Sequence, residues 1–435
     1  MSVAKFSIPE ELTRRILFTI LGLVIYRLGV AIPTPGIDAA AVLGFFQSQS
    51  GGIFGMFNTF TGGALSRFSI FALGIMPYIS ASIIFQLLQS SVPALEALSK
   101  EGDAGRKKIN QYTRYATLLL AVVQGYAIST WLLNSNNQGQ ALVKYAMFGP
   151  LPFQVVAVIT LAAGTCFLMW LGDQMTEKGI GNGISMIIFA SIAAGIPSGA
   201  ISLWQMLSNG DLNTVTGLVL LVGMVAIIAF IIFIETGQRR ITIQYSQRTQ
   251  GNQQQASYLP LKLNFAGVIP PIFASSLLLF PATITQFSDA PWLKTLQQTL
   301  SPSGSLYNIL FIGLVVFFCF FYTEMAFKPN DVADNLKKSG GFVPGIRAGK
   351  NTASYIQKVL DRLTVSGAIY LSFICVLPTM LINKIGLPFY FGGTSLLILV
   401  GVAIDTLQQI QSHLISAKYD GMGSAVKIKS RRVRY

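Results

Sequence analysis

Ten apolar runs, most of them long enough to cross a membrane, divide this chain. A helix needs roughly 20 apolar residues to span a hydrocarbon core, and the fifth and seventh runs are shorter than this. Charged residues make up 11% of the 435 residues, against about 25% in a soluble domain. The sequence therefore predicts an all-α polytopic membrane protein with ten transmembrane helices. The runs cover residues 16–32, 68–88, 115–133, 153–171, 184–196, 215–234, 265–280, 306–327, 363–382 and 396–415.

A short repeat links the second and seventh runs. Residues 74–82 read GIMPYISAS and residues 267–275 read GVIPPIFAS, with Gly, Pro, Ile, Ala and Ser in register. A repeat unit of five spans must insert in the opposite orientation the second time, so we expect two inverted five-helix halves, 1–205 and 206–435. Helix breaks are tolerated where protein or a cavity receives the freed backbone groups, which favours a pathway along the seam. The alternative is a chance match between residues that are common in membrane helices.

Lys and Arg are distributed unevenly between the two sides of the predicted spans. When the termini and the even-numbered connections are placed on one side, that side carries 26 of the 31 basic residues. The positive-inside rule then places both termini in the cytoplasm. The amino end is polar and its first apolar run leads into Pro33 without a small-residue cleavage site, so we expect no cleaved signal peptide.

Ionisable residues are scarce within the runs, which argues against an ion-coupled transporter or pump. A secondary transporter of small solutes with the same inverted repeat stays an alternative. We find no phosphate-binding motif and no cluster of catalytic or metal-binding residues, so we predict no enzyme activity, cofactor or metal. The glycine-rich stretch 179–183 has the wrong spacing for a dinucleotide turn and is interpreted as a flexible lead-in to the fifth run. The ionisable exceptions, each near a span end or beside a basic connection, are Arg27, Asp173, Glu324 and Asp405.

If a pathway follows the seam, its lining must be apolar. Ile75 and Ile79 are four residues apart and share a helix face, as do Ile184 and Ile188. A ring of branched aliphatic side chains holds ions back by dewetting, yet yields to something large and flexible. Such pairs also occur on ordinary packed or lipid-facing helices, so their spacing alone does not decide between the two interpretations.

Several longer motifs are more specific. Residues 56–67 read MFNTFTGGALSR, a stretch too short to cross a membrane and too Gly-rich to form a stable helix alone. The other motifs are FSIFALGIMPYISASIIFQLL (68–88), KINQYTRYATL (108–118), FLMWLGDQMTEKGIGNGIS (167–185), LPLKLNFAGVIPPIFASSLLLFPATI (259–284), ADNLKKSGGFVPGIR (333–347) and PFYFGGTSLLI (388–398). In this order, and over nearly the whole chain, they closely resemble the SecY family, the channel subunit of the general protein-secretion translocon.

The resemblance implies a clamshell of two five-helix halves around a central hourglass pore. It implies a passive channel that translocates unfolded preproteins across the bacterial cytoplasmic membrane and releases membrane segments laterally into lipid. The pore constriction of the family, matched motif by motif, would be a ring of six isoleucines. Two of them, Ile79 and Ile272, are also equivalent positions of the repeat. The six are Ile75, Ile79, Ile184, Ile188, Ile272 and Ile398.

The same matching implies a plug and a lateral gate. The plug would be residues 57–67, which we expect few buried contacts to hold. The gate would lie between the second, third, seventh and eighth spans, with Asn264 and Gln86 as polar gate residues; Asn264 could also serve as a helix cap. The proposed plug residues are Phe57, Phe60, Gly62, Gly63, Leu65 and Arg67.

The implied partners are the SecE and SecG subunits, the motor ATPase SecA, the ribosome and preproteins that bear signal sequences. The basic connections 235–262 and 327–362 are expected to be extended and to dock the motor or the ribosome, because basic loops attract phosphates and acidic surfaces alike. The tip 251–255 is uncharged, which argues against RNA contacts there. The basic tail 418–435 could bind anionic lipids or RNA. The docking candidates are Arg347, Arg248, Lys337 and Lys338.

Overall fold

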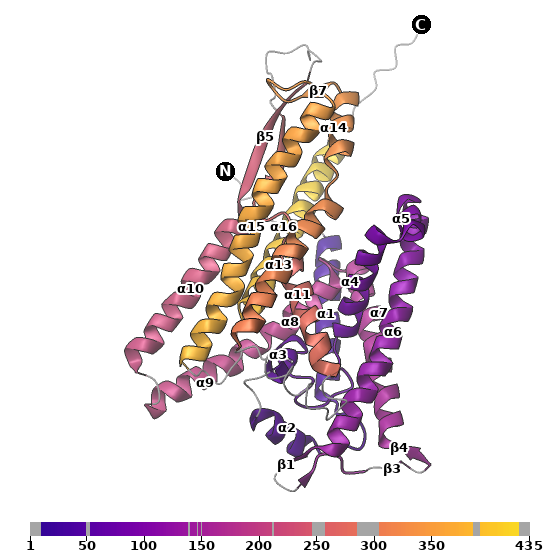
Figure 1. Ribbon diagram of the computed structural model, residues 1–435, viewed down its shortest axis with the longest axis vertical. Coiled ribbons are helices and arrows are strands. Elements are labelled where there is room, and N and C mark those ends of the chain that lie inside the picture. The colour runs from indigo at the N-terminus through magenta and orange to yellow at the C-terminus, as the bar shows by residue number, and fades with distance from the viewer. Residues whose placement is uncertain are drawn as a thin grey trace.

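The computed structural model of this chain describes residues 10–48, 53–137, 140–145, 147–148, 150–210, 213–245, 257–284, 304–385 and 392–425. Over these residues the chain is mainly helical, and long helices run side by side along the long axis of the molecule (Figure 1). A small three-stranded sheet lies at the upper end of this view, and two short hairpins lie at the lower end. The predicted all-α class is confirmed.

The first part of the chain forms nine helices and two hairpins within the described residues. The helices are α1 (Glu10–Ala31), α2 (Ala39–Ser48), α3 (Ile53–Phe60), α4 (Met76–Ser91), α5 (Pro93–Lys100), α6 (Asp103–Asn134), α7 (Phe153–Lys178), α8 (Gly183–Ala193) and α9 (Gly195–Asn209). The strands are β1 (Asn136–Asn137), β2 (Gln140–Ala141), β3 (Met147–Phe148) and β4 (Leu151–Pro152), paired antiparallel as β1 with β2 and β3 with β4.

The second part of the chain carries the three-stranded sheet and the remaining long helices. In chain order these elements are α10 (Thr214–Thr236), β5 (Gln238–Tyr245), β6 (Ser257–Lys262), α11 (Ile269–Ile284), α13 (Ser305–Ala326), α14 (Pro329–Lys338), β7 (Gly341–Phe342), α15 (Lys350–Ile385) and α16 (Gly393–Ala425). Strand β5 is central and pairs antiparallel with both β6 and β7.

Each of the ten predicted runs coincides with helix. Among the described residues, seven helical stretches are long and apolar enough to cross a membrane, and an eighth is added if α4 and α5, bent by 97° at their junction, form one broken span. The structure thus supports a protein with many membrane spans, and the count of ten stays a prediction.

Several runs differ in extent from the prediction, the second and the fifth among them. The second run was expected to be helical from residue 68, but residues 68–75 form turns and α4 begins at Met76. Gly74 has a left-handed backbone (φ +58°), and Pro77 lies in the first turn of the helix, where its missing N–H leaves no hydrogen bond unmade. The fifth run is longer than expected, because α8 and α9 together form an apolar stretch of 27 residues.

The two copies of the repeat adopt the same local structure. Gly74 and Gly267 have φ angles of +58° and +62°, and α4 and α11 each begin two residues later and contain 16 residues. Helix α4 leads into α5 at the upper end in Figure 1, whereas α11 begins below the sheet at that same end, so the two helices run in opposite directions. This match supports an inverted duplication, while the division of the chain at residue 205 stays a prediction.

Two groups of helices lie side by side in Figure 1. Helices α1, α4, α6 and α7 form one group, and α10, α13, α15 and α16 form the other. Between them, α8 contacts α1, α7 and α16, while α11 contacts α4 and α13. One buried apolar cluster extends through both groups, so the core of the molecule crosses the seam.

The glycine-rich stretch before α8 is a fixed junction, and its interpretation as a flexible lead-in is wrong. The backbone N–H of Ile180 donates to Oγ1 of Thr19 in α1 (3.0 Å), and that of Gly181 donates to Oε1 of Gln409 in α16 (2.8 Å). Asn182 caps α8 by accepting from the N–H groups of its first turn. These side-chain acceptors satisfy the backbone groups and tie α1, α8 and α16 together at one end.

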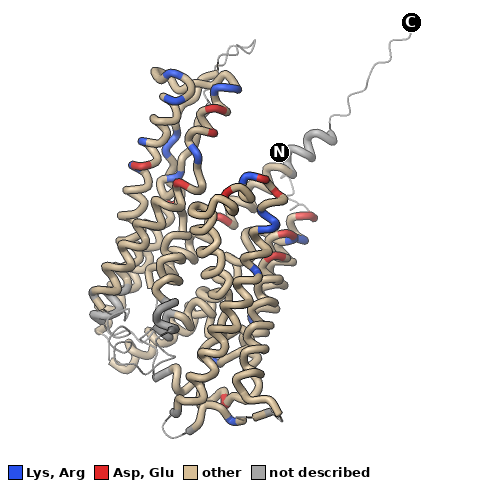
Figure 2. The backbone as a smooth tube through the Cα atoms, turned by 45° about the vertical axis from the view of Figure 1, so that its right-hand side comes forward, with Lys and Arg blue, Asp and Glu red and all other residues tan. Residues whose placement is uncertain are grey.

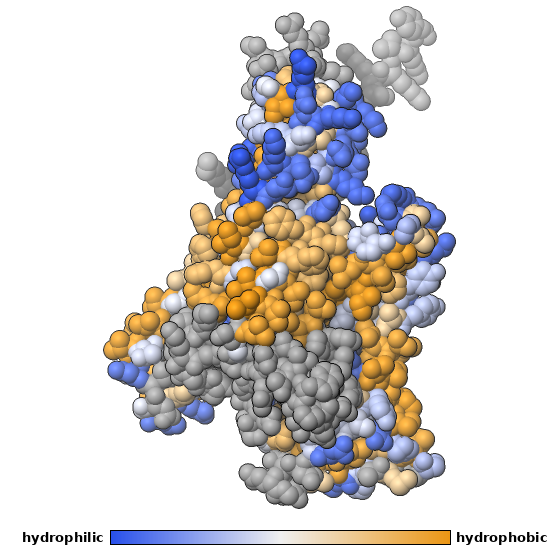
Figure 3. Space-filling view, viewed as in Figure 1, coloured by the Kyte–Doolittle hydropathy of each residue, from blue (hydrophilic) through white to orange (hydrophobic). Residues whose placement is uncertain are grey.

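Charged residues gather at one end of the molecule (Figure 2), the end that carries the sheet, α14 and α5 in Figure 1. The face seen in Figure 3 shows a hydrophilic upper end above a broad apolar band. Helix α10 belongs to this band, since only 11% of its most apolar window is buried inside the chain. An apolar belt below a charged end is the surface expected of a chain that lies mainly in lipid.

Candidate functional site

The six predicted ring isoleucines all belong to the apolar cluster that crosses the seam. Ile75, Ile79, Ile188 and Ile398 are at most 7% exposed. The other two, Ile184 and Ile272, are partly buried and pack against the same cluster. They come from α8, α11, α16 and the start of α4, that is, from both groups of helices. The structure therefore brings the six residues into one cluster, and their role as a pore constriction stays a prediction.

A small cavity lies against this cluster. It is lined by three of the isoleucines and by Phe60 of the predicted plug, together with two polar residues that sequence reasoning did not select, Tyr26 and Ser191. A polar pair within the first apolar run, Tyr26 and Arg27, was the signal that could have identified this region, because polar residues within a span generally face the protein interior.

The predicted plug, residues 57–67, folds back into the helix bundle. Its first four residues are the end of α3, and the rest form turns. Phe57, Phe60 and Leu65 are 6%, 7% and 3% exposed and belong to the same cluster as the isoleucines. Gly62 and Gly63 are half-buried, and Arg67 is exposed. The expectation that few buried contacts hold this segment is therefore wrong, because its aromatic and Leu side chains contribute to the core.

Hydrogen bonds fix the predicted plug both internally and to α1. Asn58 Oδ1 accepts from the N–H of Ser66 (2.9 Å), which closes the turn on itself. Tyr26 Oη donates to the carbonyl of Thr61 (3.0 Å), and Arg27 Nη1 donates to the carbonyl of Gly62 (3.0 Å). Two neighbouring residues of α1 thus hold two consecutive carbonyl groups of the plug.

Gly62 also brings the plug backbone against α8. Its φ angle is +65°, and a Cβ atom built there would lie 2.8 Å from Cα of Ser191. Gly63 has a similar backbone (φ +84°) but faces open space, with its nearest neighbour 4.0 Å away at Ser66 Oγ. The close approach of the predicted plug to α8 therefore requires glycine at residue 62 for space as well as for conformation.

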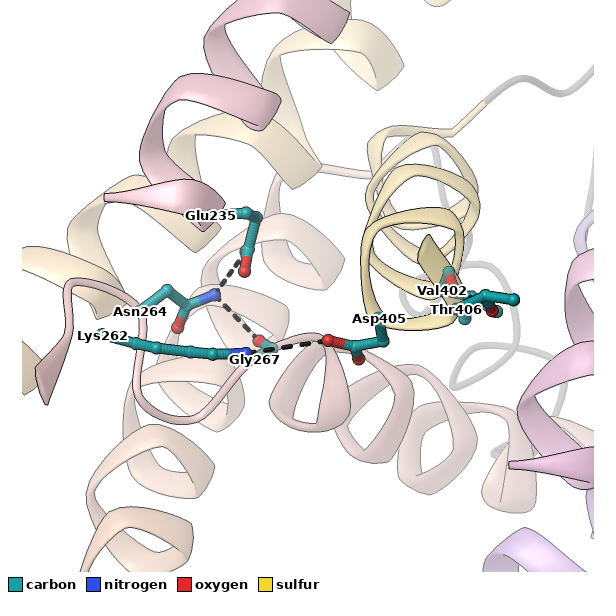
Figure 4. A network of polar contacts seen from close by, with 7 residues as sticks. All are labelled: Glu235, Lys262, Asn264, Gly267, Val402, Asp405 and Thr406. Atoms are coloured by element: carbon teal, nitrogen blue, oxygen red, sulfur yellow. Dashed lines mark hydrogen bonds and ion pairs between the residues drawn. The ribbon is translucent and has the colours of Figure 1, made fainter. Parts of the chain in front are cut away.

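Asn264, a predicted gate residue, lies in a polar network at the start of α11 (Figure 4). Its side chain is almost fully buried, and Nδ2 donates to Oε1 of Glu235 (2.7 Å) and to the carbonyl of Gly267 (3.1 Å). Because α11 begins only at Ile269, Asn264 does not cap it; it ties the segment before the helix to the end of α10. Sequence reasoning missed Glu235, a carboxylate at the last turn of an apolar span.

Gln86, the second predicted gate residue, lies half-buried on α4 and donates to Oγ of Ser82 in the same helix (3.1 Å). Helices α4 and α11 contact each other, so the two halves of the predicted gate are closed against one another. The assignment of both residues to a gate stays a prediction.

Two of the acidic residues within the spans, Asp173 and Asp405, have basic partners. Asp173 of α7 lies 2.5 Å from Arg114 of α6, and Asp405 of α16 lies 3.7 Å from Lys262 at the end of β6 (Figure 4). Both pairs are partly exposed, so each contributes little to stability. These ion pairs agree with a structural role for the two carboxylates.

The predicted docking surface lies at the charged end. Lys337 and Lys338 occupy the last turn of α14, where the helix dipole favours cations, and Arg347 lies in the turn before α15; all three are exposed. The connection 235–262 is extended as β5 and β6, as expected. The connection 327–362 is largely helical, which corrects the expectation that it is extended. Arg248, the tip 251–255 and residues 426–435 of the tail lie outside the described residues.

A second, smaller apolar cluster explains why this surface is ordered. Residues of β5, β6, α14 and α15 form it, with Ile241, Leu336 and Ile356 among its buried members. The sheet and α14 therefore pack on the projecting end of α15 and place the basic side chains on one platform.

Comparison with known proteins identifies the family. The SecY family model matches residues 69–407 of this chain. The protein translocase subunit SecY of Escherichia coli (strain K12) is 50% identical over 426 residues, which cover 96% of this chain and 95% of that protein. These matches confirm the resemblance that the motifs indicate.

Solved structures show the same fold. One is a SecY channel whose plug domain is described as stabilising the closed state and maintaining a membrane seal; its TM-score is 0.65 at 20% identity, covering 94% of this chain and 95% of that one. Another is Sec61 in the canine ribosome-channel complex from the endoplasmic reticulum, with a TM-score of 0.61 at 18% identity over 94% and 95% of the two chains. Sequence and fold together establish that this chain belongs to the SecY family.

Proposed function

We propose that this chain is the protein-conducting channel of a bacterial secretory translocase. It translocates unfolded preproteins across the cytoplasmic membrane and releases membrane segments laterally into lipid. The observation that carries this proposal is the apolar core that crosses the seam between the two groups of helices, in which four of the six isoleucines are buried and against which the other two pack, in a chain of the SecY family. The E. coli relative is a protein translocase subunit, and the structural relatives are described as translocation or ribosome-bound channels.

The ring seals the resting channel because it is apolar and crowded. Ile75, Ile79 and Ile398 are nearly inaccessible, so a hydrated ion would have to lose its water shell to pass between them. No charge at the ring binds the substrate, so a polypeptide of any sequence can slide through once the aliphatic side chains move apart. The channel therefore supplies a barrier and a path, and the energy comes from a partner.

The plug and the gate are the moving parts of this proposal. Residues 57–67 close the pore beside the ring, and helices α4, α6, α11 and α13 form the lateral gate with Asn264 and Gln86 as its polar residues. A signal sequence that binds between α4 and α11 shifts the population from a closed to an open state. Because the plug is packed and hydrogen-bonded, its release has a real free-energy cost, which keeps the unliganded channel closed.

The partners are proposed from the exposed charges and from the family. Arg347, Lys337 and Lys338 form a basic platform that suits the motor ATPase SecA or ribosomal phosphates. Arg248, in the other basic connection, is a further docking residue of this proposal. SecE and SecG complete the channel. Both termini face the cytoplasm, and the basic tail 418–435 binds anionic lipids there. The two inverted halves are residues 1–205 and 206–435.

Cysteine crosslinking of a stalled preprotein tests the pore. In a background without Cys166, Cys319 and Cys375, the mature part of the substrate is expected to crosslink to Ile79→Cys and Ile272→Cys. Matched controls on the outward faces of the same helices are Ile84→Cys and Leu277→Cys, which replace residues 44% and 41% exposed. Equal crosslinking of inward and outward sites would contradict the proposed pathway.

Reconstitution tests the function as a whole. Vesicles that hold this chain with SecE and a motor ATPase are expected to protect a preprotein from protease in an ATP-dependent manner. Vesicles with the chain alone are expected to show no counterflow of small solutes. Counterflow without preprotein protection would support the secondary transporter instead.

A further inference from the structure

The hydroxyl of Tyr26 lies at the junction of α1, the plug and the ring helix α8. Tyr26 is 1% exposed. Its Oη lies 3.0 Å from the carbonyl oxygen of Thr61 in the plug and 2.6 Å from Oγ of Ser191 in α8. Ser191 Oγ in turn lies 2.8 Å from the carbonyl oxygen of Ile187 in its own helix. Three short oxygen contacts thus meet at two hydroxyl groups.

Counting hydrogens shows that these contacts compete. Two hydroxyls supply two hydrogens, and the carbonyls of Thr61 and Ile187 can only accept. In a holding order, Ser191 donates to Tyr26, and Tyr26 donates to Thr61. In a releasing order, Tyr26 donates to Ser191, and Ser191 donates to Ile187. If each hydroxyl donated to its carbonyl, the 2.6 Å contact between the two hydroxyls would lack a hydrogen, which is unfavourable.

We propose that Tyr26 latches the plug and that Ser191 is the alternative acceptor that lets the latch open. This inference rests on the proposed function of residues 57–67 as the plug. When the plug leaves, Tyr26 loses its acceptor at Thr61, and an unsatisfied buried hydroxyl is costly. Ser191 removes this cost, because it accepts from Tyr26 and passes its own hydrogen to Ile187. The latch therefore holds the plug firmly but opens without leaving a buried donor unpaired.

The surrounding geometry links this latch to the ring. Ile184, Ile188 and Ser191 are spaced by four and three residues and lie on one face of α8. Gly62 packs its backbone against Ser191, and Arg27 holds the carbonyl of Gly62 beside the latch. A movement of α8 that widens the ring therefore moves Ser191 relative to the plug, so ring opening and plug release are coupled at this point.

Three variants of the full chain separate the latch from the alternative acceptor. Tyr26→Phe removes the donor but keeps the ring, so the resting ion leak of reconstituted vesicles is expected to rise about three- to tenfold. Ser191→Ala leaves Tyr26 free to donate to Thr61 without competition, so the leak is expected to be no higher than in the wild type, and preprotein export to be about threefold slower. The double variant is expected to leak like Tyr26→Phe, because Ser191 acts through Tyr26.

Matched controls are available in the same chain. Tyr370→Phe removes a buried hydroxyl that has no hydrogen-bond partner among the residues that the structure describes, and Ser129→Ala removes a buried hydroxyl that bonds within its own helix. Both are expected to leak like the wild type. A second readout is maleimide labelling of Ala64→Cys, a fully buried plug residue, in the background without native cysteines. Its labelling rate is expected to rise in Tyr26→Phe by the same factor as the leak.

The outcomes distinguish the latch from the function on which it rests. A leak and labelling rate in Tyr26→Phe equal to those of Tyr370→Phe would overturn the latch, as would a leak in Ser191→Ala as large as that of Tyr26→Phe. Wild-type vesicles that seal but export no preprotein in the presence of SecE and the motor would contradict the proposed function instead. Should Tyr26→Phe not accumulate, slower export by Ser191→Ala at unchanged leak supports the mechanism, and unchanged export contradicts it.

Discussion

The two copies of the repeat begin their helices in the same way but in opposite surroundings. Before α4, Gly74 packs against the plug, with Thr61 Cγ2 3.1 Å from the position of an added Cβ. Before α11, Gly267 has open space around that position, and its carbonyl is instead held by Asn264 in a polar network. The two helix starts thus share one motif, a left-handed glycine followed by proline in the first turn of the helix. Apolar packing holds this motif at one end of the bundle, and hydrogen bonds hold it at the other.

The difference follows from inversion. If the two halves insert in opposite directions, the same helix start faces the plug in one half and the charged platform in the other. The end that carries the predicted plug is apolar, because Phe57, Phe60 and Leu65 are buried in the core there. The other end adjoins strands β5 and β6 and their basic residues, so hydrogen-bonded polar groups can be accommodated there. Substitutions at one end of the bundle therefore test whether the properties of the other end stay unchanged.

The largest effect is expected at the charged end, from Arg347→Glu. Charge reversal on the exposed platform replaces attraction to the motor with repulsion, so motor-driven export is expected to fall at least about tenfold. The resting ion leak is expected to be unchanged, because the plug end is not touched. Export assays and leak assays on the same vesicles check both statements.

Lys144→Glu is the control for this change. Lys144 is exposed and precedes β3 in the chain. The hairpin of β3 and β4 lies at the opposite end from the platform (Figure 1). Its reversal is expected to leave export within about twofold of the wild type, since isolated surface charges contribute little. Equal losses in the two variants would show that net charge, and not docking, limits export.

At the plug end, Gly62→Ala is expected to have the next largest effect. The left-handed backbone costs a non-glycine residue about 1 to 2 kcal/mol, and the new Cβ would meet the backbone of Ser191 at 2.8 Å. Since backbone atoms cannot move aside like a flexible side chain, residues 57–67 must shift. We therefore expect Gly62→Ala to lower the free energy of unfolding by about 3 kcal/mol and to raise the ion leak clearly.

Gly63→Ala provides the comparison that isolates the contact. Its φ angle of +84° carries a similar conformational cost, but the added Cβ would have only Ser66 Oγ near it, at 4.0 Å. We expect Gly63→Ala to lower the free energy of unfolding by about 1 kcal/mol and to leave the ion leak close to that of the wild type. If both alanine variants leak equally, backbone strain and not packing on α8 explains the effect.

The sequence was most informative about features that are encoded within a single segment of the chain. Ten apolar runs predicted where the helices lie, and family motifs selected six isoleucines that the structure gathers in one cluster. The Gly and Pro residues of the repeat could have predicted that α4 starts late, because both residues disfavour helix before Met76.

The sequence was least informative where distant segments meet. Tyr26 and Ser191 are 165 residues apart, and no periodicity connects them. The plug was expected to be loosely held because it is Gly-rich; its burial depends on the space that α1 and α8 leave between them. The junction at Gly181 was misjudged for a similar reason, since its acceptor is Gln409 of the last helix. Such pairings depend on tertiary packing, which local propensity does not encode.

Asn264→Ala is expected to destabilise the end of the bundle that carries the Asn264 network and to leave the end that carries the predicted plug unaffected. It leaves the carboxylate of Glu235 without its short hydrogen bond and frees the carbonyl of Gly267, at a cost of about 1 to 3 kcal/mol in the free energy of unfolding. Adding Glu235→Gln completes a double-mutant cycle, and the effects are expected to be non-additive because the two residues share one bond. Thermal unfolding in detergent measures the cost, and the ion leak is expected to stay at the wild-type level.

The smallest effect gives the most direct test of the comparison, by placing Ala at each repeat glycine. Gly74→Ala and Gly267→Ala both force a left-handed backbone on a non-glycine residue, with φ angles of +58° and +62°, so both start from a cost of about 1 kcal/mol. At Gly74 the methyl group would also press on the Thr61 side chain at 3.1 Å, whereas at Gly267 it meets open space. We therefore expect Gly74→Ala to be more destabilising by a few tenths to about 1 kcal/mol, and to raise the ion leak because Thr61 belongs to the plug. Equal thermal stabilities and equal leaks would mean that the plug does not pack on the start of α4, and that the two copies are anchored alike.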